Sequence, residues 1–315
     1  MTEFDLDSIE AVAKKDFQDA IRSRALLVLA TVFVVFFAAS AYFFADAVQQ
    51  QLQAAANASN ASQAQAAQQA QQGLTSDAFL DALTQVTRLL IPLTGIVVAY
   101  AALVGERESG TLKLLLALPH SRLDVVLGKL AGRSAVVSAP VLLGFLVAAP
   151  IFPILGVTLE PVNFALFAVA TAFIGVVFVA LSVGISAAAP TSRRAVITVV
   201  GLYALFTLLW GQFTNALIRE VSKNTDLGNT ALIKVFLVLK HLNPVGTYRS
   251  LVASIGQEAL QARVSLVGGF QSRIFAQQLG EVPIYLTDAA LVAYLLAWIV
   301  VPVALGYWAF QDADL

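Results

Sequence analysis

Long stretches without a charged side chain constrain this chain more than any other feature. A helix needs about 20 consecutive apolar residues to cross the hydrocarbon core of a bilayer. Uncharged runs of about that length recur along the sequence. We therefore predict an all-α integral membrane protein with six transmembrane helices. The predicted spans cover residues 25–45, 83–105, 134–159, 162–189, 195–218 and 289–311.

Composition supports a lipid environment. Hydrophobic residues make up 58% of the 315 residues and charged residues only 12%, whereas soluble domains carry about 25% charged residues. The formal net charge of −1 gives no reason to expect a nucleic-acid partner. Without cysteine, disulfides and thiol chemistry are excluded. His120 and His241 lie too far apart for a helical zinc motif, and we predict no metal site.

Basic residues predict the orientation of the spans, because cytoplasmic loops are enriched in Lys and Arg. No Lys or Arg occurs from residue 46 to 87, between the first two predicted spans. The predicted inner segments carry Lys14, Lys15, Arg22, Arg24, Arg107, Lys113, Arg122, Lys129, Arg133, Arg193 and Arg194. Both termini are thus expected in the cytoplasm, with the protein in the cytoplasmic membrane. The outer segment 219–287 is also basic, but long loops cross largely regardless of charge.

Several segments outside the spans have a composition that predicts their structure. Within residues 1–24, apolar residues follow one helical face, which predicts an interfacial helix on the inner membrane surface. Segment 49–72 is rich in Gln and Ala, and is either disordered or a polar prolongation of the first span. Asn57 and Asn60 match the glycosylation pattern, which we attribute to chance in an Asn/Ser-rich run. We expect segment 219–287 to form several short helices in an extracytoplasmic cap, with a turn at Asn243-Pro244; a helical pair dipping into the membrane is the alternative.

The inner loop 106–133 carries the most specific pattern. Ser109 or Thr111 is expected to cap a short helix that Pro119 ends, and Ser121 with Asp124 forms a capping box for the next helix. The first helix is apolar nearly all round, so it must be buried on more than one side. Either a partner protein covers it or the loop is a self-contained hairpin on the membrane surface. The charges of Glu106–Glu108 can pair with a partner.

No catalytic motif accompanies this loop. The sequence lacks a Gly-x-x-x-x-Gly-Lys-Ser/Thr loop and a Gly-x-Ser-x-Gly elbow. We therefore predict that the chain is not an enzyme and has no catalytic residues and no cofactor of its own.

The run Gly-Glu-Arg-Glu-Ser-Gly-Thr-Leu-Lys-Leu-Leu-Leu-Ala-Leu-Pro-His-Ser-Arg at 105–122, followed by Gly128-Lys129, resembles the signature of type-2 ABC transporter permeases of the exporter kind. The wider plan of interfacial helix, six spans and enlarged outer segment is similar to that family over nearly the whole chain. The outer segment is similar, more narrowly, to permeases of the nitrous-oxide-reductase copper-maturation type.

The resemblance implies a permease that moves a solute with ATP bound and hydrolysed by a separate cytosolic ABC ATPase. In the family this loop is the coupling helix, which docks on the ATPase. A second permease copy, identical or paralogous, would line the pathway with this one. The resemblance assigns the coupling role to Glu106, Arg107, Glu108, Gly110, Thr111, Leu112 and Leu115.

Two other functions fit parts of the sequence. A secondary transporter would usually show inverted repeats and charged, broken helices at mid-membrane; we find no repeat and no acidic residue within a predicted span. A non-transporting scaffold or sensor could use the same inner loop to dock another protein. The substrate is not encoded in any recognisable charged pocket.

Arg88 is the one basic residue within a predicted span, where a charge is costly. It either snorkels to the headgroups or pairs within the protein, or it faces an internal cavity as part of the pathway.

Overall fold

We describe the protein from a computed structural model, which defines residues 5–56, 76–117, 121–256, 259–265 and 269–311. These residues form helices joined by turns, without a β-strand. The first two thirds of the chain contain α1 (Leu6–Ile21), α2 (Arg24–Ala56), α4 (Ser76–Ala99), α5 (Val104–Glu108), α6 (Thr111–Leu116), α7 (Arg122–Ala148), α8 (Ile151–Ile154), α9 (Pro161–Ala188) and α10 (Ser192–Ala204). It continues through α11 (Trp210–Asn224), α12 (Asn229–Leu242), α13 (Pro244–Gly256), α14 (Ala259–Val264), α15 (Gly269–Leu279) and α16 (Asp288–Gln311).

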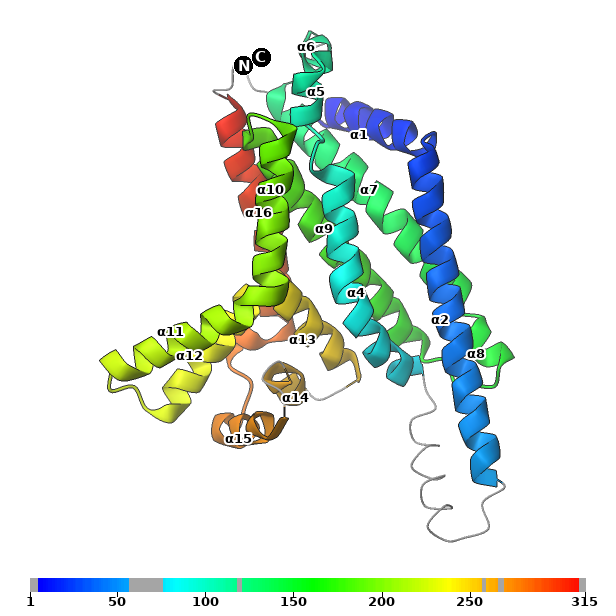
Figure 1. The fold of residues 1–315 in the computed structure, drawn as a ribbon, viewed down its shortest axis with the longest axis vertical. Coiled ribbons are helices and arrows are strands. Elements are labelled where there is room, and N and C mark those ends of the chain that lie inside the picture. The colour runs from blue at the N-terminus through cyan, green and yellow to red at the C-terminus, as the bar shows by residue number, and fades with distance from the viewer. Residues whose placement is uncertain (1–4, 57–75, 118–120, 257–258, 266–268, 312–315) are drawn as a thin grey trace.

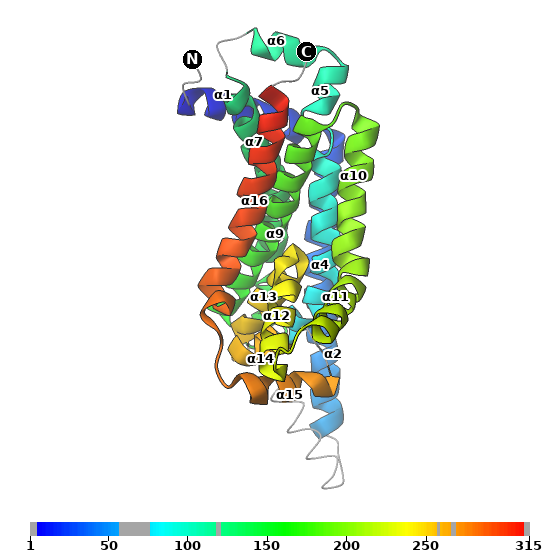
Figure 2. The ribbon, with the colours of Figure 1, turned by 90° about the vertical axis from the view of Figure 1, so that its left-hand side faces the viewer.

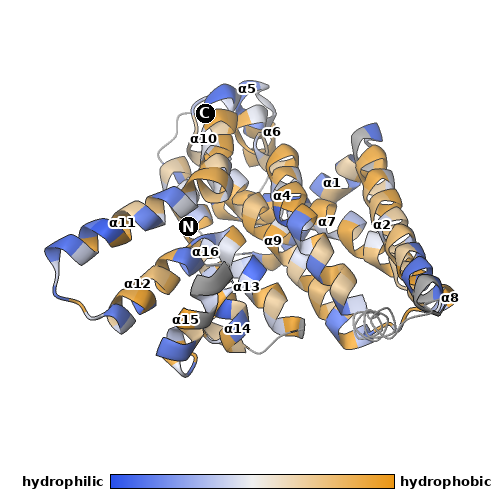
Figure 3. Cartoon of the chain, turned by 60° about the horizontal axis from the view of Figure 1, so that its bottom comes forward, coloured by the Kyte–Doolittle hydropathy of each residue, from blue (hydrophilic) through white to orange (hydrophobic). Residues whose placement is uncertain are grey.

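Six helical stretches are long and apolar enough to span a membrane, which confirms the predicted fold class. They are Leu27–Gln51, Ser76–Glu108, Arg122–Ile154, Pro161–Ala188, Ser192–Asn224 and Asp288–Gln311. Figure 3 shows hydrophobic residues along α2, α4 and α9, and hydrophilic residues gathered on α11 and α15. Large apolar side chains such as Val28, Val35 and Phe43 are more than half exposed on α2. Lipid is the solvent that suits such a surface.

Helix α9 is the central element of the bundle. Its apolar residues point in all directions, and 72% of the residues in its most hydrophobic part are buried, as expected for a helix surrounded by others. Helices α4, α7 and α16 pack around it, and α2 packs on the outside of α7. The rings of Phe37 and Phe145 join α2 to α7 with 4.3 Å between centroids.

Small residues set the closest helix contacts. A methyl group on Gly184 would lie 2.2 Å from the carbonyl oxygen of Pro302 in α16, and one on Gly95 would lie 2.9 Å from the carbonyl oxygen of Gly175. Such close approach of backbones is typical of membrane helix packing. Gly184 and Gly95 therefore serve helix packing inside one chain.

Helix α1 runs across one end of the bundle, crosswise to α2 (Figure 1). Its buried residues are Ser8, Val12 and Asp16, which face α7. The apolar Leu6 and Ile21 are exposed instead, at 67% and 46%. The last turn of α16 and the pair α5–α6 lie at this same end (Figures 1 and 2). We call it the α6 end.

The fifth spanning helix bends. A π-helical turn at Leu205–Leu209 separates α10 from α11, and α11 then leaves the bundle sideways with α12 beside it (Figure 1). The span expected over 195–218 thus consists of α10, the π-turn and the first part of α11. A π-turn inserts an extra residue into the helical ladder and is a recognised cause of kinks.

The segment 219–287, expected to form a cap outside the spans, also contributes a helix to the bundle. Helix α13 enters the bundle between α4, α9 and α16, where the fully buried Tyr248 hydroxyl lies 2.9 Å from Thr87 Oγ1 and 3.0 Å from Thr171 Oγ1. This resembles the less favoured alternative of a helical pair dipping between the spans. The predicted turn at Asn243-Pro244 is present, and the Asn243 side chain accepts a hydrogen bond from the Val245 amide at 2.9 Å.

The described part of the Gln/Ala segment, up to Ala56, prolongs α2. Asn57 and Asn60 lie outside the described residues.

We predict that Gly184→Ala will lower the melting temperature in detergent, because the added methyl group must push α9 and α16 apart. Overpacking of this kind costs about 1–3 kcal/mol. Gly201→Ala in α10 is the matched control, since nothing lies within 4 Å of the added carbon; it should leave the melting temperature unchanged or raise it. Equal shifts for the two variants would contradict the packing described.

Candidate functional site at the α6 end

The run at 105–122, which resembles the permease signature, includes a sharp corner between α5 and α6. Gly110 makes the corner with a φ of 75°, a conformation that side chains with a Cβ rarely adopt. The Ser109 and Thr111 hydroxyls both donate to the Glu106 carbonyl, at 3.2 and 3.4 Å. The sequence predicted that one of these residues caps α6. Neither does, because both hydroxyls bond to the Glu106 carbonyl within the corner. Pro119 and His120 lie outside the described residues, while the capping box of Ser121 and Asp124 is confirmed.

Helix α6 has one face toward the bundle and one face outward. Leu112 is fully buried and Leu115 is 7% exposed, packed with residues of α4 and α7. Leu114 is 72% exposed, and Thr111 and Lys113 are exposed beside it. The bundle therefore covers only one side of this apolar helix.

Glu106 belongs to a network of charges inside the chain. The Lys129 ammonium of α7 lies 2.5 Å from the Glu106 carboxylate and 2.8 Å from that of Asp16 in α1. Arg133, one turn further along α7, lies 2.9 Å from the other oxygen of Asp16. The Lys129 and Asp16 side chains are only 7% and 3% exposed. Opposite charges at these distances compensate one another's desolvation.

Arg107 closes the end of α9. Its guanidinium donates to the carbonyl oxygens of Ala187 and Ala189, both at 3.1 Å. The last carbonyls of a helix lack partners within the helix and carry partial negative charge, so a cation stabilises them. The same guanidinium lies 5.5 Å from the ring centroid of Phe310 in α16. Arg122 approaches that ring at 5.4 Å and donates to the Phe310 carbonyl at 2.6 Å.

Glu108 binds the beginning of α10. Its carboxylate accepts hydrogen bonds from the Ser192 amide at 2.8 Å and from the Ser192 hydroxyl at 2.5 Å. An anion at a helix N-terminus satisfies orphan amides and interacts favourably with the helix dipole. At the start of α5, the Ser186 hydroxyl of α9 accepts from the amides of Leu103 and Val104, both at 3.1 Å.

The three consecutive charges thus connect the corner to four other helices. Glu106 leads to α7 and α1, Arg107 to α9, and Glu108 to α10. The sequence predicted that these charges can pair with a partner protein; in the structure they bond within the chain. Sequence reasoning did not predict that Lys129, Ser192 and Phe310 are their partners, because each is distant along the chain. It also missed Asp16, which shares Lys129 with Glu106, and Ser186, which accepts from the amides at the start of α5.

Arg88 lies in the middle of α4, twenty residues before Glu108 and away from this corner. It lines a cavity with residues of the bend at Leu205–Leu209 and of α13. Among the described residues, no three His, Asp or Glu side chains come close enough together to hold a metal ion.

Comparison with known proteins shows the family to which the chain belongs. A model of the ABC-2 family transporter protein matches residues 10–315. The chain is 30% identical over 312 residues to the probable ABC transporter permease protein NosY of Stutzerimonas stutzeri, covering 97% of this chain and 99% of the relative. It is also 30% identical over 243 residues to a NosY protein of Pseudomonas aeruginosa, covering 76% and 78%.

The chain belongs to the ABC-2 transporter family. It is a multi-pass membrane protein and the permease subunit of an ABC transporter. The predicted family resemblance is confirmed. The coupling roles of individual residues and the role of Arg88 remain predictions.

We predict that Asp16→Ala will destabilise the protein strongly, because it leaves Lys129 and Arg133 without their shared buried carboxylate. Removing one partner of a buried ion pair costs about 3–5 kcal/mol. Thermal unfolding in detergent, with proteolysis of α1 as a local readout, measures the effect. Asp19→Ala alters an exposed carboxylate on the same helix and should leave both readouts unchanged. A small effect of Asp16→Ala would show that the network does not hold α1 in place.

Proposed function

We propose that a separate cytosolic ATPase docks on the α5–α6 corner and drives conformational change in this permease through it. The observation that carries the proposal is the outward face of α6, where Leu114 is 72% exposed beside Lys113 and Thr111. A large exposed leucine surrounded by polar groups suits a protein partner. ATP would be bound by that partner, and this chain, which has no P-loop in its sequence, would contribute no catalytic site.

The corner is built to transmit displacement. Leu112 and Leu115 belong to the same buried apolar cluster as residues of α4 and α7. Displacement of α6 by the ATPase would therefore move the adjoining ends of α4 and α7 with it. Gly110 and Thr111 shape the corner, and the charged side chains carry the movement to the ends of α9 and α10. In this proposal Glu106, Arg107 and Glu108 act inside the permease.

Transport then follows from repacking of the second and fifth spans. Rigid helices joined at their ends can shift as bodies between two packings of similar stability. The energy comes from ATP hydrolysis by the partner. We propose that the solute is exported, and that the chain lies in the cytoplasmic membrane with α1, α6 and both termini on the cytoplasmic side, in agreement with the distribution of Lys and Arg.

A second permease copy completes the proposed pathway. Val97 on α4 and Ile197 on α10 are 64% and 61% exposed, and the stretch Ser192–Asn224 is the least buried of the six candidate spans among the described residues. Apolar faces on neighbouring helices suit either lipid or a second copy, identical or paralogous.

We predict that Leu114→Asp will abolish co-purification of the ATPase without lowering the melting temperature. The measurement is a tagged pull-down from native membranes in mild detergent, with mass spectrometry of the captured proteins. For the unchanged chain we expect a stoichiometric partner that carries a Walker-type P-loop.

Leu112→Ala, two residues away, is the matched control. Because Leu112 is fully buried, truncation should lower the melting temperature by the equivalent of about 2–5 kcal/mol. A folded chain that captures no ATPase would contradict the proposal and favour the scaffold or secondary-transporter alternatives. Unaltered capture by Leu114→Asp would place the docking surface elsewhere.

A further inference from the structure

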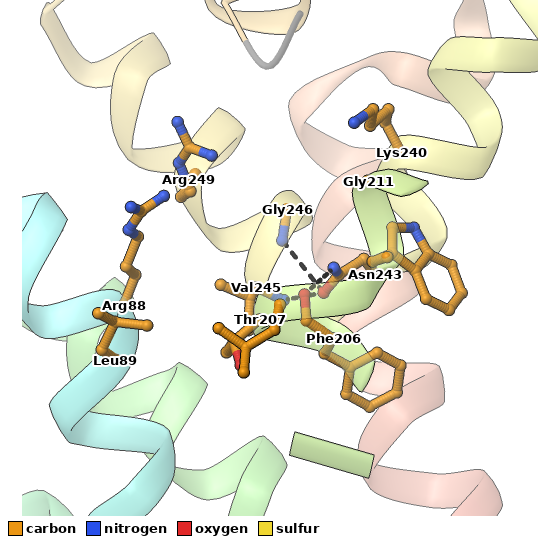
Figure 4. Close-up of a pocket in the computed structure, with 12 residues that line it drawn as sticks. Arg88, Leu89, Phe206, Thr207, Gly211, Lys240, Asn243, Val245, Gly246 and Arg249 are labelled. Atoms are coloured by element: carbon orange, nitrogen blue, oxygen red, sulfur yellow. Dashed lines mark hydrogen bonds between the residues drawn. The ribbon is translucent and has the colours of Figure 1, made fainter. Parts of the chain in front are cut away.

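A cavity of about 220 Å³ lies beside the middle of α4. Its walls come from α4, the bend between α10 and α11, the end of α12 and the start of α13 (Figure 4). The lining residues used below are Arg88, Leu89, Leu208, Lys240, Asn243 and Arg249.

Among the residues that the structure describes, three cations and no carboxylate line this cavity. In Figure 4 the guanidinium groups of Arg88 and Arg249 lie close together and come from different helices. Neither takes part in the ion pairs found among the described residues, and the buried Nε of Arg88 has no hydrogen-bond partner there. Burial, together with the nearby charge of Arg88, lowers the pKa of Arg249. Like charges held together in this way disfavour the empty cavity.

The backbone around the cations is fixed by hydrogen bonds. Asn243 accepts from the Val245 amide at 2.9 Å and donates to the Phe206 carbonyl at 2.7 Å. The indoles of Trp210 and Trp298 donate to the carbonyls of Leu239 and Leu242, both at 2.9 Å. These bonds hold the end of α12 and the start of α13 against the bend. The cavity is therefore a built feature of the fold.

The position of the cavity suits an anion that compensates buried cations. Arg88 lies in the middle of α4, eleven residues before that helix ends at Ala99, which is about 16 Å along the helix. A positive charge held inside the bundle is stabilised by a bound anion. The rim is apolar, because Leu89 and Leu208 are 39% and 68% exposed.

We propose that Arg88, Lys240 and Arg249 form a binding site for an anion of the phosphate class. Arginine forks and a lysine ammonium provide the donors that phosphate oxygens prefer. Two sources share this chemistry: the headgroup of a phospholipid, whose acyl chains would follow the apolar rim, and a free phosphorylated solute. The site does not depend on the ATPase proposal.

The test uses the purified full chain in an uncharged maltoside detergent, with two probes. Inorganic phosphate, compared with chloride at equal ionic strength, reports a soluble anion. Phosphatidylglycerol, compared with diacylglycerol of the same acyl chains, reports a headgroup. Binding is read as a thermal shift and as bound lipid by native mass spectrometry.

The double variant Arg88→Gln/Arg249→Gln should weaken the binding of the effective probe by about tenfold or more, since charge-assisted hydrogen bonds are lost. Arg219→Gln/Lys223→Gln, which removes two exposed charges from α11, should bind like the unchanged chain. Without any anion, the pocket variant should melt at the same or a higher temperature, because repulsion is relieved. A response to phosphatidylglycerol alone assigns the site to lipid, and a response to inorganic phosphate assigns it to a solute. No selective binding of either probe, or equal binding by both variants, overturns the proposal.

Discussion

The α6 end of this permease depends on the buried ammonium of Lys129. It lies within 2.8 Å of carboxylates from α1 and α5, and it comes from α7. A charge in this position stabilises the fold only while both partners are present, because an unpaired buried charge costs several kcal/mol. The close approach of α1 to α7 is possible because Gly128 and Gly132 leave room for Val12 and Asp16. The interfacial helix, the corner and the third spanning helix therefore form one unit.

That unit extends to the remaining helix ends by the same physical means. Arg107 occupies the negative end of α9 and Glu108 the positive end of α10, so both helix dipoles are complemented from the corner. At the other end, the buried guanidinium of Arg263 donates to the Leu286 carbonyl and lies 2.5 Å from Asp288. Hydrogen bonds thus fix the bundle at both ends, and between them small residues allow close packing. Such a body can be shifted as a whole from one end.

Composition was enough to predict the class of fold. The number of spanning helices, the capping box at Ser121 and the turn at Asn243 all follow from local rules that a single segment satisfies. Contacts between distant segments could not be predicted that way. The leucine run at 112–116 does not show that Leu112 and Leu115 face inward while Leu114 faces out. The charges at 106–108 do not show which helix ends they reach, and the bend at Leu205–Leu209 has no sequence signal that we recognise. Arg88 was recognised as unusual, but its cavity needs Lys240 and Arg249, which are remote in sequence.

The most direct test of rigid transmission is a distance measurement within one copy. Spin labels on Ala117→Cys at the end of α6 and Ile197→Cys on α10 can be introduced without removing any native thiol, since the chain has no cysteine. Labelled chains are diluted with unlabelled ones and bound to the ATPase, and the pair distance is measured without nucleotide and in the ATP-trapped state. The account predicts an unchanged distance within the copy, while the same label on α10 moves relative to its counterpart in a fully labelled pair. A changed α6–α10 distance with stationary spans would contradict it, because the corner would then be a hinge.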